Sequence, residues 1–248
     1  MTLSELVDAL SARRGPALTW YGADGGRTEL GGPVVARWVA KIANLLGTDL
    51  AGDLFDEPAP APGAPAGPGS PVRVVRVDLG RSWQAVVWTA AAWLSGWEVR
   101  GGAPTDSPGG GAIGEDGAAV WVVSHVESAS ARAAQDGMWV LAHDLSPLAL
   151  SWAGEPLPEG VLDALSDLAV QPDALVVAPD AVWQGPADGS PQPGGSLRVL
   201  VVADDAASTT RFVLAHWAAG HSVVVAGAEP GDDGALDRIA TQEHAVRV

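Results

Sequence analysis

The stretch that decides the fold is Val72-Arg73-Val74-Val75-Arg76-Val77-Asp78-Leu79, followed by Ser82-Trp83-Gln84-Ala85-Val86-Val87 and Ala91-Ala92-Trp93-Leu94-Ser95-Gly96. The first part is short and rich in β-branched residues, as is typical of a buried strand. In the second part, Ser82 is a preferred N-cap residue, and the apolar residues behind it share one face of a helix. The stretch therefore predicts a strand followed by a helix, the repeating unit of α/β proteins.

The same alternation continues along the chain. Further strands are expected at 97–100, 119–124, 138–142, 174–178, 197–203 and 222–226. Further helices are expected at 127–135, 159–169, 209–219 and 233–244. Short, continuously apolar strands between helices indicate an α/β fold with a mostly parallel, doubly wound sheet that has helices on both faces.

The N-terminal part departs from this alternation. Strands at 17–21 and 27–30, joined by the turn signal Asp24-Gly25-Gly26, predict a hairpin. Before it, Thr2 and Glu5 form the capping-box pattern that opens a helix. After it, a helix is expected from Pro33, a favoured first residue, to Gly47, a favoured terminator.

Composition limits the classes of partner. The chain has 248 residues and a formal net charge of −16, so its field repels nucleic acid and anionic membrane surfaces. It has no cysteine, which excludes disulfides and thiolate sites. The longest apolar stretch, Ala85 to Leu94, is far shorter than the ~20 residues that span a bilayer. We therefore expect a cytoplasmic protein with no nucleic-acid or membrane partner.

One segment differs in kind from the rest. Residues 56–71 are rich in proline, alanine and glycine and cannot build a core, which predicts a flexible surface insertion. Because closing a long loop costs little extra free energy, the insertion interrupts one domain and does not separate two. A single domain over residues 1–248 is therefore expected.

Several stretches resemble a known family. Ala17-Leu18-Thr19-Trp20-Tyr21, Arg27-Thr28-Glu29-Leu30 and Asn44-Leu45-Leu46 are similar to the start of acyl-CoA synthetases and other AMP-binding enzymes. Residues 73–96 are similar to their second strand and helix, and residues 198–225 to a later strand–helix–strand unit. The chain thus resembles a truncated N-terminal domain of the adenylate-forming enzymes, like short relatives known from GC-rich bacteria. The resemblance covers residues 17–100 and 197–245 and implies the fold of that domain.

The chemistry of that family depends on a Ser/Thr- and Gly-rich loop ending in Pro-Lys-Gly, which holds the ATP phosphates. The resemblance places this loop between Ala178 and Leu197, and residues 179–190 there contain two aspartates and no lysine. Lys41 is the only lysine of the chain. The adenine-binding and ribose-binding segments and the C-terminal domain with its catalytic lysine have no counterpart either. The resemblance therefore implies a relative that does not catalyse adenylation, and no cofactor is predicted.

Polar residues after the strands are candidates for a cleft, because ligands of parallel sheets bind beyond the carboxyl ends of the strands. If these ends are neighbours, a histidine and an aspartate form a general acid–base pair or hold a divalent metal. The alternative is that they only form turns and helix caps, since no metal-ligand motif such as H-x-x-x-H is present. The candidates are His125, His143, Asp144 and Asp205.

Two other features have simpler interpretations. Gly109-Gly110-Gly111-Ala112-Ile113-Gly114 superficially suggests a dinucleotide-binding turn, but it follows Pro108 instead of an apolar strand, which favours a plain loop. Trp183, in a loop rich in glycine and proline, is either a partner contact or an ordinary packing residue, and packing is favoured.

Two functions stay open. The first is a non-catalytic domain that keeps the scaffold and binds a protein partner or a small acyl-type ligand. The second is an enzyme with a new or partner-completed activity in acyl or AMP chemistry, using the strand-end histidines and aspartates. Because a shortened fold leaves faces uncovered, self-association or a protein partner is expected in either case.

Overall fold

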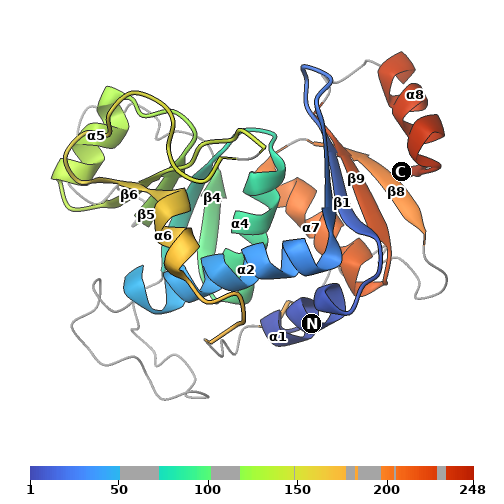
Figure 1. Ribbon diagram of the computed structural model, residues 1–248, viewed down its shortest axis with the longest axis horizontal. Helices are drawn as coiled ribbons and strands as arrows, with labels where there is room; N and C mark the ends of the chain where they lie inside the picture. The colour runs from blue at the N-terminus through green and yellow to red at the C-terminus, as the bar shows by residue number, and fades with distance from the viewer. Residues whose placement is uncertain are drawn as a thin grey trace.

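The computed structural model confirms the α/β class and divides the strands between two five-stranded sheets. Figure 1 shows the two sheets with a layer of helices between them. The described residues are 1–50, 73–101, 118–147, 149–176, 182–183, 197–203, 205–227 and 233–248.

The first sheet has the strand order β10-β8-β9-β1-β2. Its members are β1 (Pro16–Tyr21), β2 (Arg27–Gly31), β8 (Arg198–Val202), β9 (Ser222–Ala226) and β10 (Val246–Arg247). The two N-terminal strands form the expected antiparallel hairpin, and β1 pairs in parallel with β9. The N-terminal hairpin is thus completed by strands from the far end of the sequence.

The second sheet has the strand order β4-β3-β5-β6-β7, and every pair in it is parallel. Its members are β3 (Val74–Asp78), β4 (Glu98–Gly101), β5 (Ala118–Val123), β6 (Trp139–Ala142) and β7 (Val161–Asp163). Because the strands are parallel, their carboxyl ends lie at one edge of the sheet.

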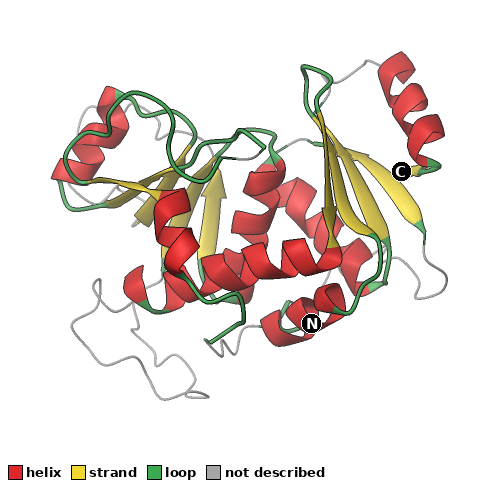
Figure 2. Cartoon of the chain, in the orientation of Figure 1, coloured by secondary structure: helices red, strands yellow, loops and turns green. Residues whose placement is uncertain are grey.

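Helices cover both faces of each sheet, as Figure 2 shows. The described helices are α1 (Leu3–Ser11), α2 (Gly32–Gly47), α4 (Trp83–Leu94), α5 (Ser128–Gln135), α6 (Ala164–Val170), α7 (Ala206–Ala218) and α8 (Asp233–Glu243). Helices α2, α4 and α7 lie between the sheets, α8 covers the outer face of the first sheet, and α5 covers that of the second.

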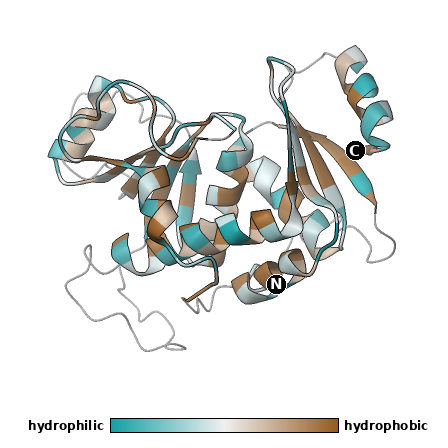
Figure 3. Cartoon of the chain, in the orientation of Figure 1, coloured by the Kyte–Doolittle hydropathy of each residue, from teal (hydrophilic) through white to brown (hydrophobic). Residues whose placement is uncertain are grey.

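The alternation of side chains along the strands builds these layers. Val223 and Val225 of β9 belong to the core between the sheets, and Val224 belongs to the cluster under α8. In β5, Val122 faces the middle layer and Trp121 faces the outer cluster with α5. Strands that are buried on both faces are continuously apolar, and β8 and β9 of the first sheet are accordingly mostly brown in Figure 3.

The expected helix caps are present. Thr2 and Glu5 form a complete capping box at α1, and the Ser82 side chain accepts a hydrogen bond from the Ala85 backbone N–H at 3.1 Å. These contacts satisfy N–H groups that have no partner inside the helix.

The strand predicted at 174–178 is wrong in its described part, because residues 174–176 pair with no strand. A buried side chain takes the place of a neighbouring strand. The Nδ2 of Asn44 donates hydrogen bonds to the carbonyls of Pro172 at 3.2 Å and Ala174 at 2.9 Å, and its Oδ1 accepts the Val176 N–H at 2.9 Å.

The helix predicted at 159–169 is correct only in its second half. Its first residues form β7, which pairs with β6, and α6 begins at Ala164. The Asp163 side chain accepts hydrogen bonds from the N–H groups of Leu165 and Ser166, so it ends the strand and caps the helix.

Three predicted features lie wholly or largely outside the described residues: the insertion at 56–71, the glycine run 109–114 and the loop 179–190, apart from Val182 and Trp183. Trp183 is partly buried against the main core, and its backbone N–H donates to the Met1 carbonyl at 2.9 Å. This confirms the packing interpretation of Trp183. In the part of the chain that the structure describes, no helix has the length and hydropathy needed to cross a bilayer.

Candidate binding site

The carboxyl edge of the second sheet brings three of the four candidate residues into one region. His125 follows β5, and His143 and Asp144 follow the neighbouring strand β6. The backbone N–H of His143 donates to the Val123 carbonyl at 2.8 Å, which continues the pairing of the two strands. Asp205 follows β8 in the first sheet and is therefore separate from the other three.

The loop after β3 connects the two strand-end regions. A hollow of about 10 Å³ lies between this loop and the start of α7, where Gly80, Arg81 and Ser82 approach Asp205. This volume is at most enough for one water molecule. This hollow is therefore too small for a larger ligand.

Both candidate aspartates are occupied by backbone groups. Asp144 accepts the N–H of Ser146 at 2.8 Å and the N–H of Ala153 at 3.3 Å, and the hydrogen bonds from Ser146 lower the pKa of Asp144. Asp205 caps α7 by accepting the Ser208 N–H at 2.8 Å, and hydrogen bonds from Ser208 lower the pKa of Asp205. Both carboxylates thus have the roles of turn and cap residues.

His143 is the buried member of the set, with 1% of its surface exposed. Its Nδ1 lies 3.0 Å from the Asp144 carbonyl oxygen, and because a carbonyl only accepts, Nδ1 carries the proton. The ring centroid lies 6.0 Å from that of Trp38 and 6.3 Å from that of Trp88. Burial lowers the pKa of His143, so its imidazole is neutral at pH 7. Its Nε2 has no hydrogen-bond partner among the described residues.

His125 differs from His143 in being exposed. Asp78, at the end of β3, interacts electrostatically with His125, and burial raises the pKa of Asp78 against the opposing effect of Arg76. Among the described residues, no group of three or more His, Cys, Asp or Glu side chains is arranged to hold a metal ion. A catalytic pair formed by these residues stays a prediction.

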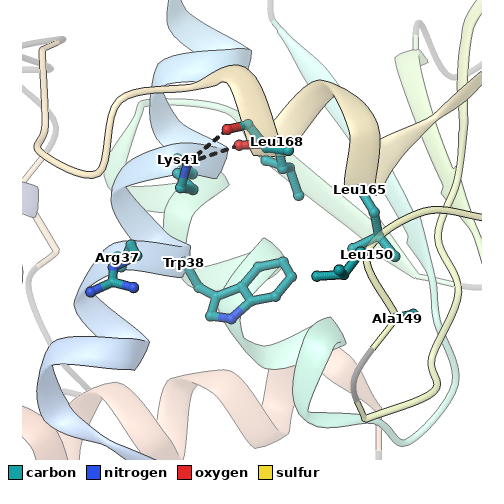
Figure 4. A pocket seen from close by; sticks show the side chains of 8 residues that line it. Arg37, Trp38, Lys41, Ala149, Leu150, Leu165 and Leu168 are labelled. Carbon is teal, nitrogen blue, oxygen red and sulfur yellow. Dashed lines mark hydrogen bonds between the residues drawn. The ribbon is translucent and has the colours of Figure 1, made fainter.

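A pocket lies beside this edge, between α2, α6 and the segment 149–150 that connects β6 to β7 (Figure 4). Its volume is about 200 Å³. The residues that line it are Arg37, Trp38, Lys41, Ala149, Leu150, Leu165, Leu168 and Ala169.

The walls of this pocket are mostly apolar. Figure 4 shows the Trp38 indole and the Leu150 and Leu165 side chains around one space. Trp38 packs edge-to-face against Trp83, with the ring centroids 5.2 Å apart and an interplanar angle of 79°. Leu165 and Leu168 are buried, whereas Leu150 is 86% exposed at the mouth. The pocket therefore has an aromatic wall, Trp38, and an exposed leucine, Leu150, at its mouth.

Two cations of α2 lie at the rim, and both have partners. The Nζ of Lys41 donates to the carbonyls of Leu168 at 3.1 Å and Ala169 at 3.3 Å, and also to the Gln171 carbonyl. Lys41 thereby caps the last turn of α6. Asp173 forms ion pairs with Lys41 at 3.1 Å and with Arg37 at 3.2 Å.

Sequence reasoning did not find this pocket. Trp38 had the spacing of a core residue, and Lys41 was notable only as the single lysine. The pocket is formed by residues of α2 and α6 that are more than 120 positions apart, such as Lys41 and Leu168, which differ by 127. No local motif marks such a site.

Comparisons with known proteins show which folds this chain is similar to. No protein-family model matches the chain, and no curated protein sequence matches it. Solved structures do match. An acyl-CoA synthetase from Brucella canis covers 99% of this chain with a TM-score of 0.62 and 17% sequence identity. The acetoacetyl-CoA synthetase from Streptomyces lividans covers 98% with a TM-score of 0.58 and 18% identity.

The chain has the fold of the N-terminal part of adenylate-forming enzymes. The N-terminal subdomain of Klebsiella oxytoca NpsA supports this placement, with a TM-score of 0.50 over 98% of this chain at 12% identity. The chain spans 46% of the Brucella canis protein and 41% of the Streptomyces lividans protein, which is less than half of each. At these identities the likeness concerns the adenylate-forming fold, and it confirms the fold that the sequence resemblance implied.

Proposed function

We propose that the chain is a non-catalytic domain of the adenylate-forming fold that acts by binding a small apolar ligand in the pocket between α2 and α6. The observation that carries the proposal is this pocket of about 200 Å³ with apolar walls and a preformed Trp38 surface. Concave, mostly apolar, preformed pockets are typical of small-molecule sites. A short acyl group is the ligand class that the resemblance to acyl-CoA synthetases suggests.

The state of Lys41 supports a binding role. Catalysis of adenylation in the family uses lysines, and this sequence contains Lys41 alone. Its ammonium is bonded to three backbone carbonyls and paired with Asp173. An ammonium held in this way stabilises α6 and is not available to a phosphate group.

An enzyme remains the second candidate, favoured by one observation. The neutral His143 imidazole has an unpartnered Nε2, which is the form that a general base needs. The substitutions His125→Ala and His143→Ala separate the two functions in a deletion strain complemented with each variant. Full complementation by both variants contradicts the enzyme and leaves the binding domain.

A protein partner or self-association belongs to the same proposal. Leu150 and Val170, near the two ends of the pocket region, are 86% and 79% exposed, and a contact with another chain would remove them from water. We expect a mass above that of the monomer in light scattering at tens of micromolar protein, and a monodisperse monomer would contradict this part. A cytoplasmic location is also proposed, and cell fractionation tests it.

Thermal-shift titration of the purified chain tests the binding function. Ligands that bind only the folded state raise the melting temperature by mass action. The ligands are hexanoate, ATP, AMP and an acyl-adenylate analogue, with and without magnesium. We expect a dose-dependent rise with hexanoate, through its apolar chain, and none with ATP, AMP or the acyl-adenylate analogue. A rise with ATP or AMP would contradict the non-catalytic assignment.

A further inference from the structure

We propose that the pocket between α2 and α6 selects an uncharged aromatic molecule of one or two rings, in preference to a carboxylate. This inference rests on the proposed binding function and specifies the ligand class of the same site. Three properties of the pocket support it: its volume, its aromatic wall and the pairing of its cations.

The volume limits the ligand to a ring-sized molecule. An apolar cavity of ~150 Å³ in a protein core takes up benzene. The present pocket has about 200 Å³, which is enough for a substituted ring or a fused bicyclic ring. A long acyl chain would not fit in this volume.

The aromatic wall favours a planar ligand. Trp38 is fixed by an edge-to-face contact with Trp83 and lies 6.0 Å from the His143 ring, so its indole is already oriented before a ligand binds. Aromatic rings in offset or edge-to-face contact gain interaction energy beyond the area that they bury. A preoriented wall also lowers the entropic cost of binding. The exposed Leu150 lies beside the indole in Figure 4 and would contact a bound ring.

The charges at the rim disfavour an anion. Both lining cations, Arg37 and Lys41, are already paired with Asp173, and Lys41 also bonds to three carbonyls. The ammonium of Lys41 has three N–H donors and three carbonyls accept them, so a carboxylate that binds Lys41 would have to displace one of these contacts. The formal net charge of −16 adds a long-range repulsion. An uncharged ring avoids both costs.

Calorimetry on the full chain tests the inference with three probes: indole, indole-3-acetate and hexanoate. We expect indole to bind at least tenfold more tightly than either acid. The variant Ala169→Phe places a ring at the pocket edge and should weaken indole binding at least tenfold. Ala129→Phe, at an exposed position of α5 away from the pocket, is the matched control and should bind indole like the unmodified chain.

The outcomes separate this inference from the proposed function. Equal or tighter binding of an acid overturns the selection of neutral rings and leaves a binding pocket. Absence of binding for all three probes overturns both. Unchanged indole binding in Ala169→Phe places the ligand elsewhere and also overturns the inference. If circular dichroism shows that Ala169→Phe does not fold, Leu150→Ala replaces it, since this side chain is exposed, and a loss of several-fold is expected.

Discussion

Arg27 on β2 donates a hydrogen bond from Nε to the Oε1 of Glu243 at 2.8 Å, across the outer face of the first sheet. Glu243 lies at the end of α8 and is 8% exposed. The Tyr21 hydroxyl and the Arg198 guanidinium donate to the same carboxylate. A single buried carboxylate therefore links α8 to three strands of the sheet, β1, β2 and β8.

We expect Glu243→Gln to lower the free energy of unfolding by about 2–3 kcal/mol at pH 7. The hydrogen bond from Arg27 is the largest cause that lowers the pKa of Glu243 from 4.5 to about 2. The folded state thus binds its proton later than the unfolded chain does. The stabilisation is complete above pH 4.5 and is lost as the pH falls towards 2.

Urea unfolding at several pH values measures this effect. The difference between the unmodified chain and Glu243→Gln should shrink as the pH falls below 4.5. Glu159→Gln, at an exposed position, is the control and should change little. A difference that stays constant down to pH 3 would show that the carboxylate contributes packing and not charge.

The buried pair His216 and His221 makes stability depend on pH near neutrality. Their Nδ1 atoms lie 3.0 Å apart, so one ring donates and the other accepts. Burial, together with His221, lowers the pKa of His216 from 6.5 to about 4. Because the unfolded chain takes up the proton first, stability falls as the pH drops from 6.5 towards 4.

The variant His216→Asn keeps a polar atom near the Nδ1 position and removes the titration. We expect it to reduce the loss of unfolding free energy between pH 7 and pH 4.5 by about 2 kcal/mol. His125→Asn changes an exposed histidine and is the matched control. Identical pH profiles for His216→Asn and the unmodified chain would contradict the assignment.

Lys41→Met tests the cap on α6. Methionine keeps an apolar stem but loses the hydrogen bonds to Leu168, Ala169 and Gln171, and we expect a loss of about 1–3 kcal/mol of unfolding free energy. Arg37→Met removes only the exposed ion pair with Asp173 and should cost less than about 1 kcal/mol. Chemical denaturation measures both, and equal losses would refute the capping role.

Asn44→Ala tests the side chain that replaces a strand neighbour. It leaves the carbonyls of Pro172 and Ala174 and the N–H of Val176 without their side-chain partner. Groups unpaired in a buried position cost free energy, so we expect a loss of about 2–4 kcal/mol. Native-state hydrogen exchange should show the Val176 amide exchanging faster, and an unchanged rate there would contradict this account.

The helices and strands that begin or end at a clear capping or turn residue were predicted correctly. Ser82 caps the helix that it was expected to cap, and the turn at Asp24 joins the expected hairpin. Where local and tertiary preferences disagree, the prediction failed. Residues 174–176 are apolar enough for a strand, but their backbone forms hydrogen bonds with the Asn44 amide and not with a neighbouring strand. The three residues of β7 are too few to interrupt a helical pattern.

The division into two sheets and the pocket could not be predicted from the sequence, because both depend on contacts between distant residues. A strand that is buried on both faces shows no preference for one neighbour, so the sequence of β8 does not indicate that it pairs with β9 and not with β3. The pocket depends in the same way on distant pairs such as Trp38 and Leu165. Three of the four strand-end candidates do gather at one edge, because parallel pairing alone decides this.

Because Lys41 is the only lysine and its Nζ lies at the pocket, its amine is a natural chemical reporter. Lysine acylation requires an accessible amine, and hydrogen bonds to the carbonyls of α6 engage this one. An amine-selective reagent should therefore modify Lys41 slowly in the folded chain and faster whenever α6 opens. The rate at which Lys41 is labelled would then report both the opening of α6 and the occupancy of the pocket, with no substitution in the chain.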